Sequence, residues 1–331
     1  MKIVIDSAIP FIRGVFEPYA EVVYCEGGVI GAEQVKDCDA LVVRTRTRCN
    51  SELLEGSRVR FIATATIGRD HIDEEYCRKA GIEVVSAAGC NARGVLQWVA
   101  AALKTLLLTN AQRPEDCCLG VVGVGNVGSL VVEYARNWGF DVLPCDPPRQ
   151  MREGGEYYSI DEVARRCDII TFHTPLDAST HHLVDKRLLS MMRPNAVIIN
   201  ASRGAVVDNV AMAQSSHPYI FDVWENEPNL NSLVLDGAML ATPHIAGYSL
   251  QGKANATSMV VNALSEFFKL PIVGWYPDGV QPTAPTMIDW DAMCRTVDEY
   301  CPICDETRLL KSSPDTFEKQ RNEYNYRAEY F

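Results

Sequence analysis

Two residues in the second half of the chain have side chains suited to proton transfer and to anion binding. His244 lies in the segment TPHIAGY, between a proline and an Ile-Ala-Gly run, so we expect it in a fixed turn. An imidazole ionises near neutral pH and can take a hydroxyl proton while a hydride leaves the same carbon. Arg203, in the segment SRG, offers a guanidinium fork that matches a carboxylate. The two side chains therefore predict proton removal beside a bound carboxylate.

A nearby acid would hold the orientation of the histidine ring and favour its imidazolium form. The segment ENEP supplies two candidates, Glu225 and Glu227. Their spacing alone does not choose between them, so both remain candidates at this point.

The segment GVGNVG fits the glycine pattern of a dinucleotide-binding turn. Its glycines are Gly123, Gly125 and Gly128. An apolar run precedes them and a helix is predicted from Val127 to about Trp138, so a pyrophosphate can approach the helix N-terminus. Asp146, about 20 residues beyond the glycines, would accept both ribose hydroxyls and repel a 2′-phosphate, which favours NAD over NADP. A methyltransferase can share these features, so the remaining site residues have to decide.

The segment RTRTR, from Arg44 to Arg48, concentrates positive charge in a chain whose formal net charge is −12. Arginine and threonine side chains both donate hydrogen bonds to phosphate. Strand alternation would separate the arginines from Thr45 and Thr47, so all five serve one pocket only if the strand has already ended. We expect this segment, and Thr45 above all, to contact an anionic substrate. The alternative is a solvated basic edge strand.

Short apolar runs alternate with longer helical stretches, which is typical of βαβ units and parallel sheets. The runs of a first set begin at Lys2, Glu21, Ala40, Phe61 and Glu83. The runs of a second set begin at Leu119, Asp141, Asp168, Ala196, Tyr219 and Met239. A helix from about Ala92 to Leu108 separates the sets, and its apolar positions are too dense for an exposed face. The predicted fold class is α/β, with two doubly wound parallel sheets and that helix buried.

Polar side chains directly follow most of these runs. They are Arg44, Thr45, Arg46, Thr66, His173, Thr174, Ser202, Arg203, Glu225, Glu227 and His244, with Asp222 inside a run. Ligands of open parallel sheets bind beyond the carboxyl ends of the strands. We therefore expect these residues to form binding sites.

The composition excludes several classes of function. A sequence pI near 5.0 argues against nucleic acid as a partner, since that binding needs a broad cationic surface. We find no signal peptide, and the longest apolar region is too short to span a bilayer, so no membrane partner is expected. Twelve scattered cysteines favour reduced thiols in a cytoplasm. The pair Cys301 and Cys304 lacks a second pair to complete a zinc site, and we expect no metal.

The last part of the chain differs from the rest. A Pro/Thr-rich stretch begins at Gln281, and afterwards β-like runs are few while tyrosine and charge increase. We expect residues 281–331 to form a small third module, with a terminal helix from about Phe317 to Tyr330.

Several motifs, in order along the chain, resemble the D-isomer-specific 2-hydroxyacid dehydrogenase superfamily. They are GVGNVG at Gly123, HTPL at His173, NASRGAVVD at Asn200, DVWENEP at Asp222 and PHIAG at Pro243. The resemblance implies a substrate-binding domain of residues 1–93 and about 255–280, with an NAD-binding Rossmann domain of residues 94–254 inserted into it. It also implies that the last module is an α+β dimerisation region of a homodimer.

The same resemblance assigns roles to residues. It implies a catalytic set of Arg203, Glu227 and His244, which chooses Glu227 over Glu225. Besides the three glycines, the implied cofactor contacts are Asn126, Val127, Asp146, Thr174, Ala201, Ser202, Arg203, Asp222 and Gly247. The implied substrate contacts are Thr45, Thr66 and Tyr248, to which the charge argument adds Arg44 and Arg46.

A narrower set of motifs resembles the branch of this superfamily that oxidises 4-phospho-D-erythronate on the route to pyridoxal 5′-phosphate. They are VRTRT at Val43, TATIGRDHID at Thr64, GCN at Gly89, CDPPR at Cys145 and HIAGYSLQGK at His244. That substrate carries about three negative charges, so Arg203 would bind its carboxylate and the arginine segment its phosphate. Two alternatives are another D-2-hydroxyacid dehydrogenase, for example one acting on 3-phosphoglycerate, and an NAD-sensing corepressor of the same fold. The complete Arg/Glu/His set favours an enzyme.

Overall fold

The computed structural model describes all residues from 1 to 331, and they form two compact units. Unit 1 consists of residues 1–91 and 250–282, and unit 2 of residues 92–249 and 283–331. The last segment therefore packs as part of unit 2, where we predicted a separate third module. The physical reason is burial: Trp290, Met293 and Phe331 of this segment lie in the main core of unit 2.

The sheet of unit 1 has five parallel strands in the order β2-β1-β3-β4-β5. They are β1 (Lys2–Asp6), β2 (Glu21–Cys25), β3 (Ala40–Val43), β4 (Phe61–Thr64) and β5 (Glu83–Ser86). Successive side chains alternate between the two faces: Val4 packs on one side, and Ile3 and Ile5 on the other. This order is the flavodoxin-like arrangement of a doubly wound sheet.

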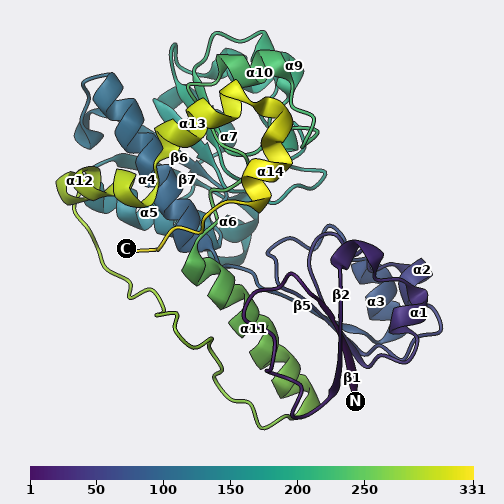
Figure 1. Cartoon of the computed structure of the whole chain (residues 1–331). Coiled ribbons are helices and arrows are strands. Elements are labelled where there is room, and N and C mark those ends of the chain that lie inside the picture. The colour runs from purple at the N-terminus through teal and green to yellow at the C-terminus, as the bar shows by residue number, and fades with distance from the viewer. The chain divides into compact units, whose positions relative to one another are not determined.

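Helices cover both faces of that sheet (Figure 1). One face carries η1 (Gly27–Val29), α1 (Ala32–Val35), α2 (Ser51–Leu54) and α3 (Glu74–Ala80). The other face carries the long helix α11 (Leu250–Phe268), whose Val260, Val261 and Leu264 pack against the strands. Unit 1 thus needs a helix that follows the whole of residues 92–249 in the sequence.

The sheet of unit 2 has six parallel strands in the order β11-β10-β9-β8-β6-β7. They are β6 (Cys118–Val122), β7 (Asp141–Cys145), β8 (Ile169–Phe172), β9 (Val197–Asn200), β10 (Tyr219–Phe221) and β11 (Leu240–Ala241). Beyond β7, the backbone N–H of Tyr158 donates to Pro144 O at 2.8 Å, where a Rossmann fold has a further strand. The order reverses between β6 and β8, so this is the switch point at which doubly wound sheets bind ligands.

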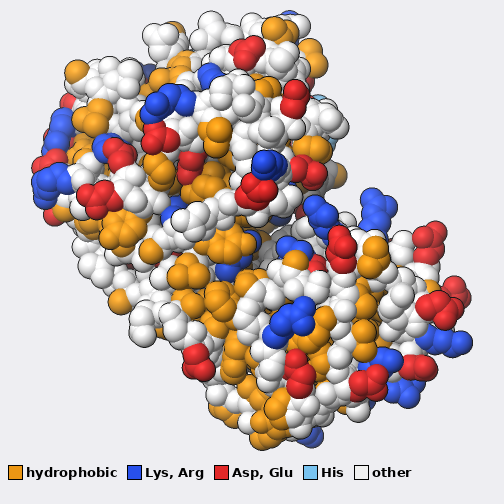
Figure 2. All heavy atoms as spheres, in the orientation of Figure 1, with side chains coloured by type: hydrophobic (Ala, Val, Ile, Leu, Met, Phe, Trp, Pro, Cys, Tyr) orange, Lys and Arg blue, Asp and Glu red, His pale blue; other side chains and the backbone are white.

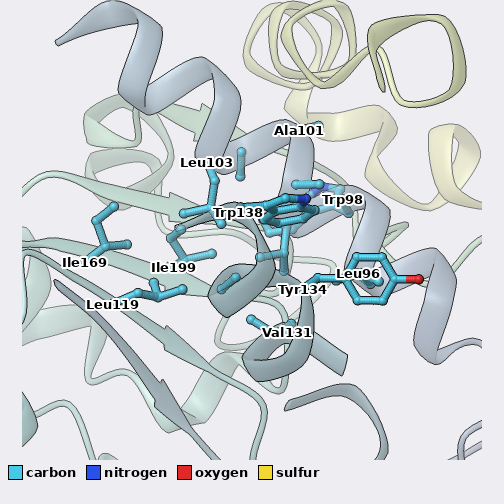
Figure 3. Packing of buried hydrophobic residues seen from close by; sticks show 14 of the residues in the cluster. Leu96, Trp98, Ala101, Leu103, Leu119, Val131, Tyr134, Trp138, Ile169 and Ile199 are labelled. Atoms are coloured by element: carbon cyan, nitrogen blue, oxygen red, sulfur yellow. The ribbon is translucent and has the colours of Figure 1, made fainter. Parts of the chain in front are cut away.

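One face of this sheet is covered by η2 (Pro114–Asp116), α4 (Ala92–Thr109), α5 (Asn126–Trp138) and α12 (Trp290–Tyr300). Figure 3 shows Trp98 and Leu103 of α4 beside Trp138 of α5, above Leu119 and Ile199 of the strands. The predicted burial of the first of these helices is confirmed, because most of its residues are buried. This packing fixes the start of α5, which follows the glycine turn directly.

The remaining helices of unit 2 are α6 (Pro147–Glu153), α7 (Ile160–Arg166), α8 (Lys186–Met191), α9 (Asn209–Ala213), α10 (Ser232–Gly237), α13 (Ile303–Ser312) and α14 (Phe317–Asn322). Two single turns, η3 (Gly204–Val206) and η4 (Pro314–Thr316), complete the elements. The α/β fold class with two doubly wound sheets is confirmed. The last segment is helical, with one isolated bridge between Ser249 and Arg327.

The terminal helix predicted from Phe317 to Tyr330 is wrong beyond Asn322, where α14 ends. Arg327 explains the difference, because its guanidinium donates to the backbone carbonyls of Gly94, Ile245 and Ala246. These bonds hold residues after α14 in an extended course along the core.

The surface carries no broad basic patch on the face that Figure 2 shows, where lysine and arginine are interspersed with acidic side chains. None of the helices combines the length and apolar character needed to cross a membrane. All twelve cysteines are free, including Cys301, which is buried, and Cys304, which is exposed.

Candidate active site

His244 and Glu227 form a hydrogen-bonded pair in the loops that follow β11 and β10. His244 Nδ1 lies 2.7 Å from Glu227 Oε2, and Glu227 Oε1 accepts the backbone N–H of Trp224 at 2.8 Å. Burial opposes ionisation of Glu227, but the hydrogen bond and charge of His244 outweigh it and lower the pKa of this carboxyl. The carboxylate is therefore ionised and fixes the ring, which leaves Nε2 as the nitrogen available to a reactant.

The neighbouring acid, Glu225, has different partners. Its Oε1 lies 2.8 Å from His182 Nε2, and its Oε2 accepts the N–H of Asn209 at 3.3 Å. Sequence spacing left both acids as candidates for the partner of His244. The geometry favours Glu227, because Glu225 ties the loop to a different part of unit 2.

Asp222 holds the turn that presents His244. Its Oδ1 accepts the hydroxyl of Thr242 at 2.5 Å and the N–H of Ile245 at 2.8 Å, and its Oδ2 accepts the N–H of Ala246 at 2.9 Å. Burial raises its pKa, although the charge of His244 and these hydrogen bonds act in the opposite direction. Asp222 was predicted to contact the cofactor, and the structure uses both carboxylate oxygens to shape the catalytic turn.

Arg203 follows β9 and lies on the loop next to Glu227. Asn200 organises this loop, since its Oδ1 accepts both the N–H and the hydroxyl of Ser202 and its Nδ2 donates to Arg203 O. At Gly204, an added Cβ would lie 2.0 Å from the backbone carbonyl of Trp224, so the two loops touch through their backbones. The half-buried Arg203 directs Nη1 to Ser202 O at 2.9 Å.

The glycine turn lies at the switch point between β6 and β8. Gly123 has φ +85°, and a Cβ there would lie 2.7 Å from the carbonyl of His173, which begins the loop after β8. At Gly128 a Cβ would lie 1.9 Å from Gly123 O, whereas the space at Gly125 is open. Only glycine permits this close crossing of turn, helix and neighbouring strand.

These surroundings fit a dinucleotide. The helix that starts at Asn126 and Val127 has no side chain capping its N-terminus, so its first N–H groups can bind a pyrophosphate. Thr174 Oγ1 is buried without a partner beside the turn, as expected of a hydroxyl that waits for a ligand. Ala201, after β9, and Gly247, after the histidine turn, are half-buried in the same unit.

Asp146 directly follows β7 and caps the N-terminus of α6. Its Oδ1 accepts the N–H of Arg149 at 2.9 Å, and its Oδ2 accepts the N–H of Val124 at 2.8 Å. Each carboxylate oxygen has a second lone pair, which is what two ribose hydroxyls require. The bond to Val124 joins this carboxylate to the glycine turn.

The arginine segment lies in unit 1 and begins where β3 ends, at Val43. Strand alternation therefore does not apply to it, and the alternative of an edge strand is wrong because β3 lies between β1 and β4. Arg44 Nε lies 2.9 Å from Oδ2 of the fully buried Asp6. Thr47 is buried and donates to Gly27 O, whereas Thr45, Arg46 and Arg48 are exposed.

Thr66 lies at the end of the neighbouring strand β4. Its hydroxyl shares a 2.7 Å hydrogen bond with that of Thr64, which lies 3.1 Å from His71 Nε2. Burial lowers the pKa of His71. Of the predicted substrate residues, Arg44, Thr45, Arg46 and Thr66 thus belong to unit 1, and Tyr248 belongs to unit 2.

Reasoning from the sequence missed Arg321, which lies on α14. Its Nε donates to Tyr248 Oη at 3.0 Å, and its Nη1 lies 4.0 Å from Glu227 Oε2. Nothing in the local sequence pattern marks this arginine, because its partners precede it by more than seventy residues.

One group of potential metal ligands lies close together: His181, His182 and Glu225. The two imidazole rings are stacked, with centroids 4.0 Å apart and planes 27° apart. A metal bound to a ring nitrogen lies in the plane of that ring, so stacked rings do not aim at one ion. His182 is instead hydrogen-bonded to Glu225.

Comparison with known proteins agrees with this geometry. The NAD-binding-domain model of the D-isomer specific 2-hydroxyacid dehydrogenases matches residues 97–246. Erythronate-4-phosphate dehydrogenase from Bacteroides thetaiotaomicron is 42% identical over 99% of this chain and 97% of the relative. The protein of that name from Pseudomonas fluorescens is 39% identical over 98% of this chain and 90% of the relative.

Solved structures share the fold. NAD⁺-bound 3-phosphoglycerate dehydrogenase from Entamoeba histolytica superposes with a TM-score of 0.69 at 25% identity, covering 85% of this chain and 99% of that one. D-Lactate dehydrogenase from Aquifex aeolicus, complexed with NAD and lactic acid, gives a TM-score of 0.68 at 24% identity, covering 84% of this chain and all 100% of that one.

Proposed function

Because the chain belongs to the erythronate-4-phosphate dehydrogenase family, we propose that it uses NAD to oxidise 4-phospho-D-erythronate to (R)-3-hydroxy-2-oxo-4-phosphobutanoate. This reaction lies on a route to pyridoxal 5′-phosphate, the cofactor form of vitamin B6. The observation that best supports the proposal is the 2.7 Å contact between His244 Nδ1 and Glu227 Oε2. It prepares Nε2 of His244 to meet the hydroxyl of a hydroxy acid.

His244 acts as the general base. Its Nε2 takes the proton of the hydroxyl at C2, and the C2–O bond becomes a carbonyl as the hydrogen on C2 leaves with both bonding electrons. Glu227 stabilises the imidazolium that forms and keeps the ring in one orientation. NAD, when bound, supplies the acceptor for the hydride. The proton passes from Nε2 to solvent after the product leaves.

Arg203 binds the substrate carboxylate and polarises the carbonyl as it forms. The contact of its Nη1 with Ser202 O sets the direction of the side chain. The close packing of Gly204 on the backbone of Trp224 keeps its loop against that of Glu227. Arg203 and His244 then act on the substrate directly, while Glu227 acts through His244.

The phosphate binds to the segment from Arg44 to Arg48 in unit 1. Thr66 of unit 1 and Tyr248 of unit 2 are proposed as further substrate contacts. Thr45 and Arg46 are exposed and have side chains suited to a phosphate. Arg44 adds charge but shares it with Asp6, which reduces what it contributes to the ligand. The domain assignment belongs to the same proposal, with unit 1 binding substrate and unit 2 binding NAD.

A cytoplasmic homodimer completes the proposal. The free state of all twelve cysteines, among them Cys118 and Cys167 with sulfur atoms 3.5 Å apart, suits a reducing compartment. Leu309, on the helical last segment, is 54% exposed and suits a subunit interface. Light scattering after size-exclusion chromatography measures the mass and distinguishes a dimer from a monomer.

The direct test follows NADH absorbance with purified protein, NAD and 4-phospho-D-erythronate. Parallel reactions contain 3-phosphoglycerate or unphosphorylated erythronate. If NADH absorbance does not rise, the reaction is repeated with a 2-oxo acid acceptor, which reoxidises retained NADH to NAD, and turnover is then measured from the oxidised product of the hydroxy acid. Selective oxidation of the phosphorylated four-carbon acid supports the proposal. Turnover of another acid alone would contradict the substrate assignment but keep the catalytic set. Binding of NAD without any turnover would favour the corepressor alternative.

A further inference from the structure

Arg321 brings a positive charge from the last segment of the chain to the catalytic pair. Its Nη1 lies 4.0 Å from Glu227 Oε2, the same oxygen that contacts His244 Nδ1. Its Nε donates to the hydroxyl of Tyr248 at 3.0 Å, and its guanidinium carbon lies 5.9 Å from the centre of that ring. One side chain thus contacts both the acid of the catalytic pair and a predicted substrate residue.

The position of Arg321 is fixed by the residues that follow it. Arg327 is buried and donates to Ile245 O at 3.0 Å and to Gly94 O at 2.9 Å, and it also bonds Ala246 O. A bridge between Ser249 and Arg327 joins the same segment to the chain just after Tyr248. The segment that carries Arg321 is therefore held against the residues that directly follow His244.

The charges around Glu227 come from two elements. His244 approaches from the loop after β11, and Arg321 approaches from α14. Asp222 is a further acid, and its charge acts on both cations. Burial acts to raise the pKa of Glu227, whereas the contact and charge of His244 and the N–H of Trp224 lower it, and the charge of Arg321 is a further cause of the lowering. Without the charge of Arg321, Glu227 is easier to protonate. His244 is then the one cation that remains beside Glu227 Oε2.

We propose that Arg321 is a positioning residue of the oxidation, which keeps Glu227 charged and holds Tyr248 in place, so that the last segment completes the active site of its own chain. This inference rests on the proposed function and extends it to a residue outside the catalytic set. The role is electrostatic and orienting, so its loss lowers the rate of the chemical step more than the affinity for substrate.

Arg321→Gln tests the proposal, with Lys319→Gln as a matched control because Lys319 is an exposed cation on the same helix. We expect Arg321→Gln to lower kcat about ten- to a hundredfold, the range typical of residues that orient a functional group from behind. KM for the phosphorylated acid should change less than threefold or so. The acid limb of the pH–rate profile should move to higher pH, while Lys319→Gln leaves both parameters unchanged. Arg321→Lys should restore part of kcat.

A loss confined to KM for the phosphorylated acid would show that Arg321 binds phosphate, which overturns the positioning role. An unchanged kcat in Arg321→Gln would overturn it as well. Tm and NADH affinity of each variant report folding, and Arg321→Lys serves if the glutamine variant is unstable.

A second measurement is independent of the substrate. With labelled histidine, the six histidines give few NMR signals, and His244→Asn identifies the relevant one. The chemical shift of the His244 signal should change in Arg321→Gln and stay unchanged in Lys319→Gln, because only Arg321 lies beside the Glu227 oxygen that contacts the ring. If the wild type oxidises a different hydroxy acid, the kinetic comparison is made with that acid, so failure of the substrate assignment and failure of this inference remain separate.

Discussion

At the scale of single residues, the backbone of His244 is as informative as its ring. Its φ is +58°, a left-handed value that few residues other than glycine adopt. Asp222 stabilises this turn through Thr242, Ile245 and Ala246. The backbone that presents the imidazole is thus held by a buried carboxylate, and active sites commonly hold strained residues through such surrounding contacts.

His244→Ala should lower kcat roughly 10²- to 10⁴-fold, because the general base is lost. Glu227→Gln should cost roughly 10²-fold or more, since a neutral amide stabilises neither the ring orientation nor the imidazolium. Steady-state kinetics at saturating substrate measure both. NADH binding is the control and should be unchanged. Near-native turnover of His244→Ala would remove this residue from the mechanism.

The protein should lose stability in mild acid because it buries His173 in the neutral form. Burial lowers the pKa of this histidine to about 3, and its Nδ1 has no hydrogen-bond partner. The unfolded chain binds the proton more readily, so stability falls as pH drops below the unfolded value near 6.5 and continues to fall towards pH 3. His173→Asn should therefore lose less stability than the wild type between pH 7 and pH 5. Urea unfolding midpoints at the two pH values provide the measurement, and equal losses would contradict the assignment.

At the scale of elements, the end of β3 decides what the arginine segment can do. Because the strand stops at Val43, the next residues turn and spread their side chains in different directions. Arg44 turns back to neutralise Asp6, and Arg46 stays exposed. Neighbouring arginines of one motif therefore serve different purposes.

The variants Arg44→Met and Arg46→Met separate these purposes. Loss of Arg44 leaves the buried Asp6 without its ion pair and should cost about 1–3 kcal/mol of unfolding free energy, a value reduced because Arg44 is partly exposed. Arg46→Met should leave stability unchanged and raise KM for the phosphorylated acid. Chemical denaturation and steady-state kinetics on both variants test this. Equal effects on stability would contradict the division of roles.

The elements that the sequence predicted well are those with strong local signals. Every apolar run is a strand in the structure, and α5 starts within the GVGNVG motif, as predicted. The motif is a strong signal because Gly128 packs so closely on Gly123 O that no larger residue fits there. The choice of Glu227 came from family resemblance, and the structure adds the partner that Glu225 has in His182. Arg321 was not predicted because its contacts arise from the tertiary packing of the last segment. Such packing produces no periodic pattern of residue types in the sequence.

At the scale of the whole molecule, the last segment links the core of unit 2 to the catalytic turn. Phe331 is buried among Tyr134 and Trp138, and Arg327 bonds the carbonyls beside His244. Stability of unit 2 and activity should therefore fall together when this segment is disturbed.

Arg327→Leu should destabilise unit 2 by at least about 3 kcal/mol, because several buried carbonyls lose charged donors. It should also lower kcat, since the turn of His244 loses its support. Arg308→Leu is the control, because Arg308 is exposed on α13 and its loss should change neither property. Denaturant unfolding followed by kinetics measures both effects. Full activity in a destabilised Arg327→Leu would contradict the link between segment and turn.

The division of unit 1 into residues 1–91 and 250–282 has a consequence for synthesis on the ribosome. The five strands emerge first, with Ile9, Ile12 and Phe16 on the same face as Ile3 and Ile5, but Val260, Val261 and Leu264 of α11 complete the cover of that face. All of residues 92–249 must be translated in between, so part of one apolar face of the nascent sheet stays open to water throughout that interval. The first unit to emerge is thus among the last to be completed.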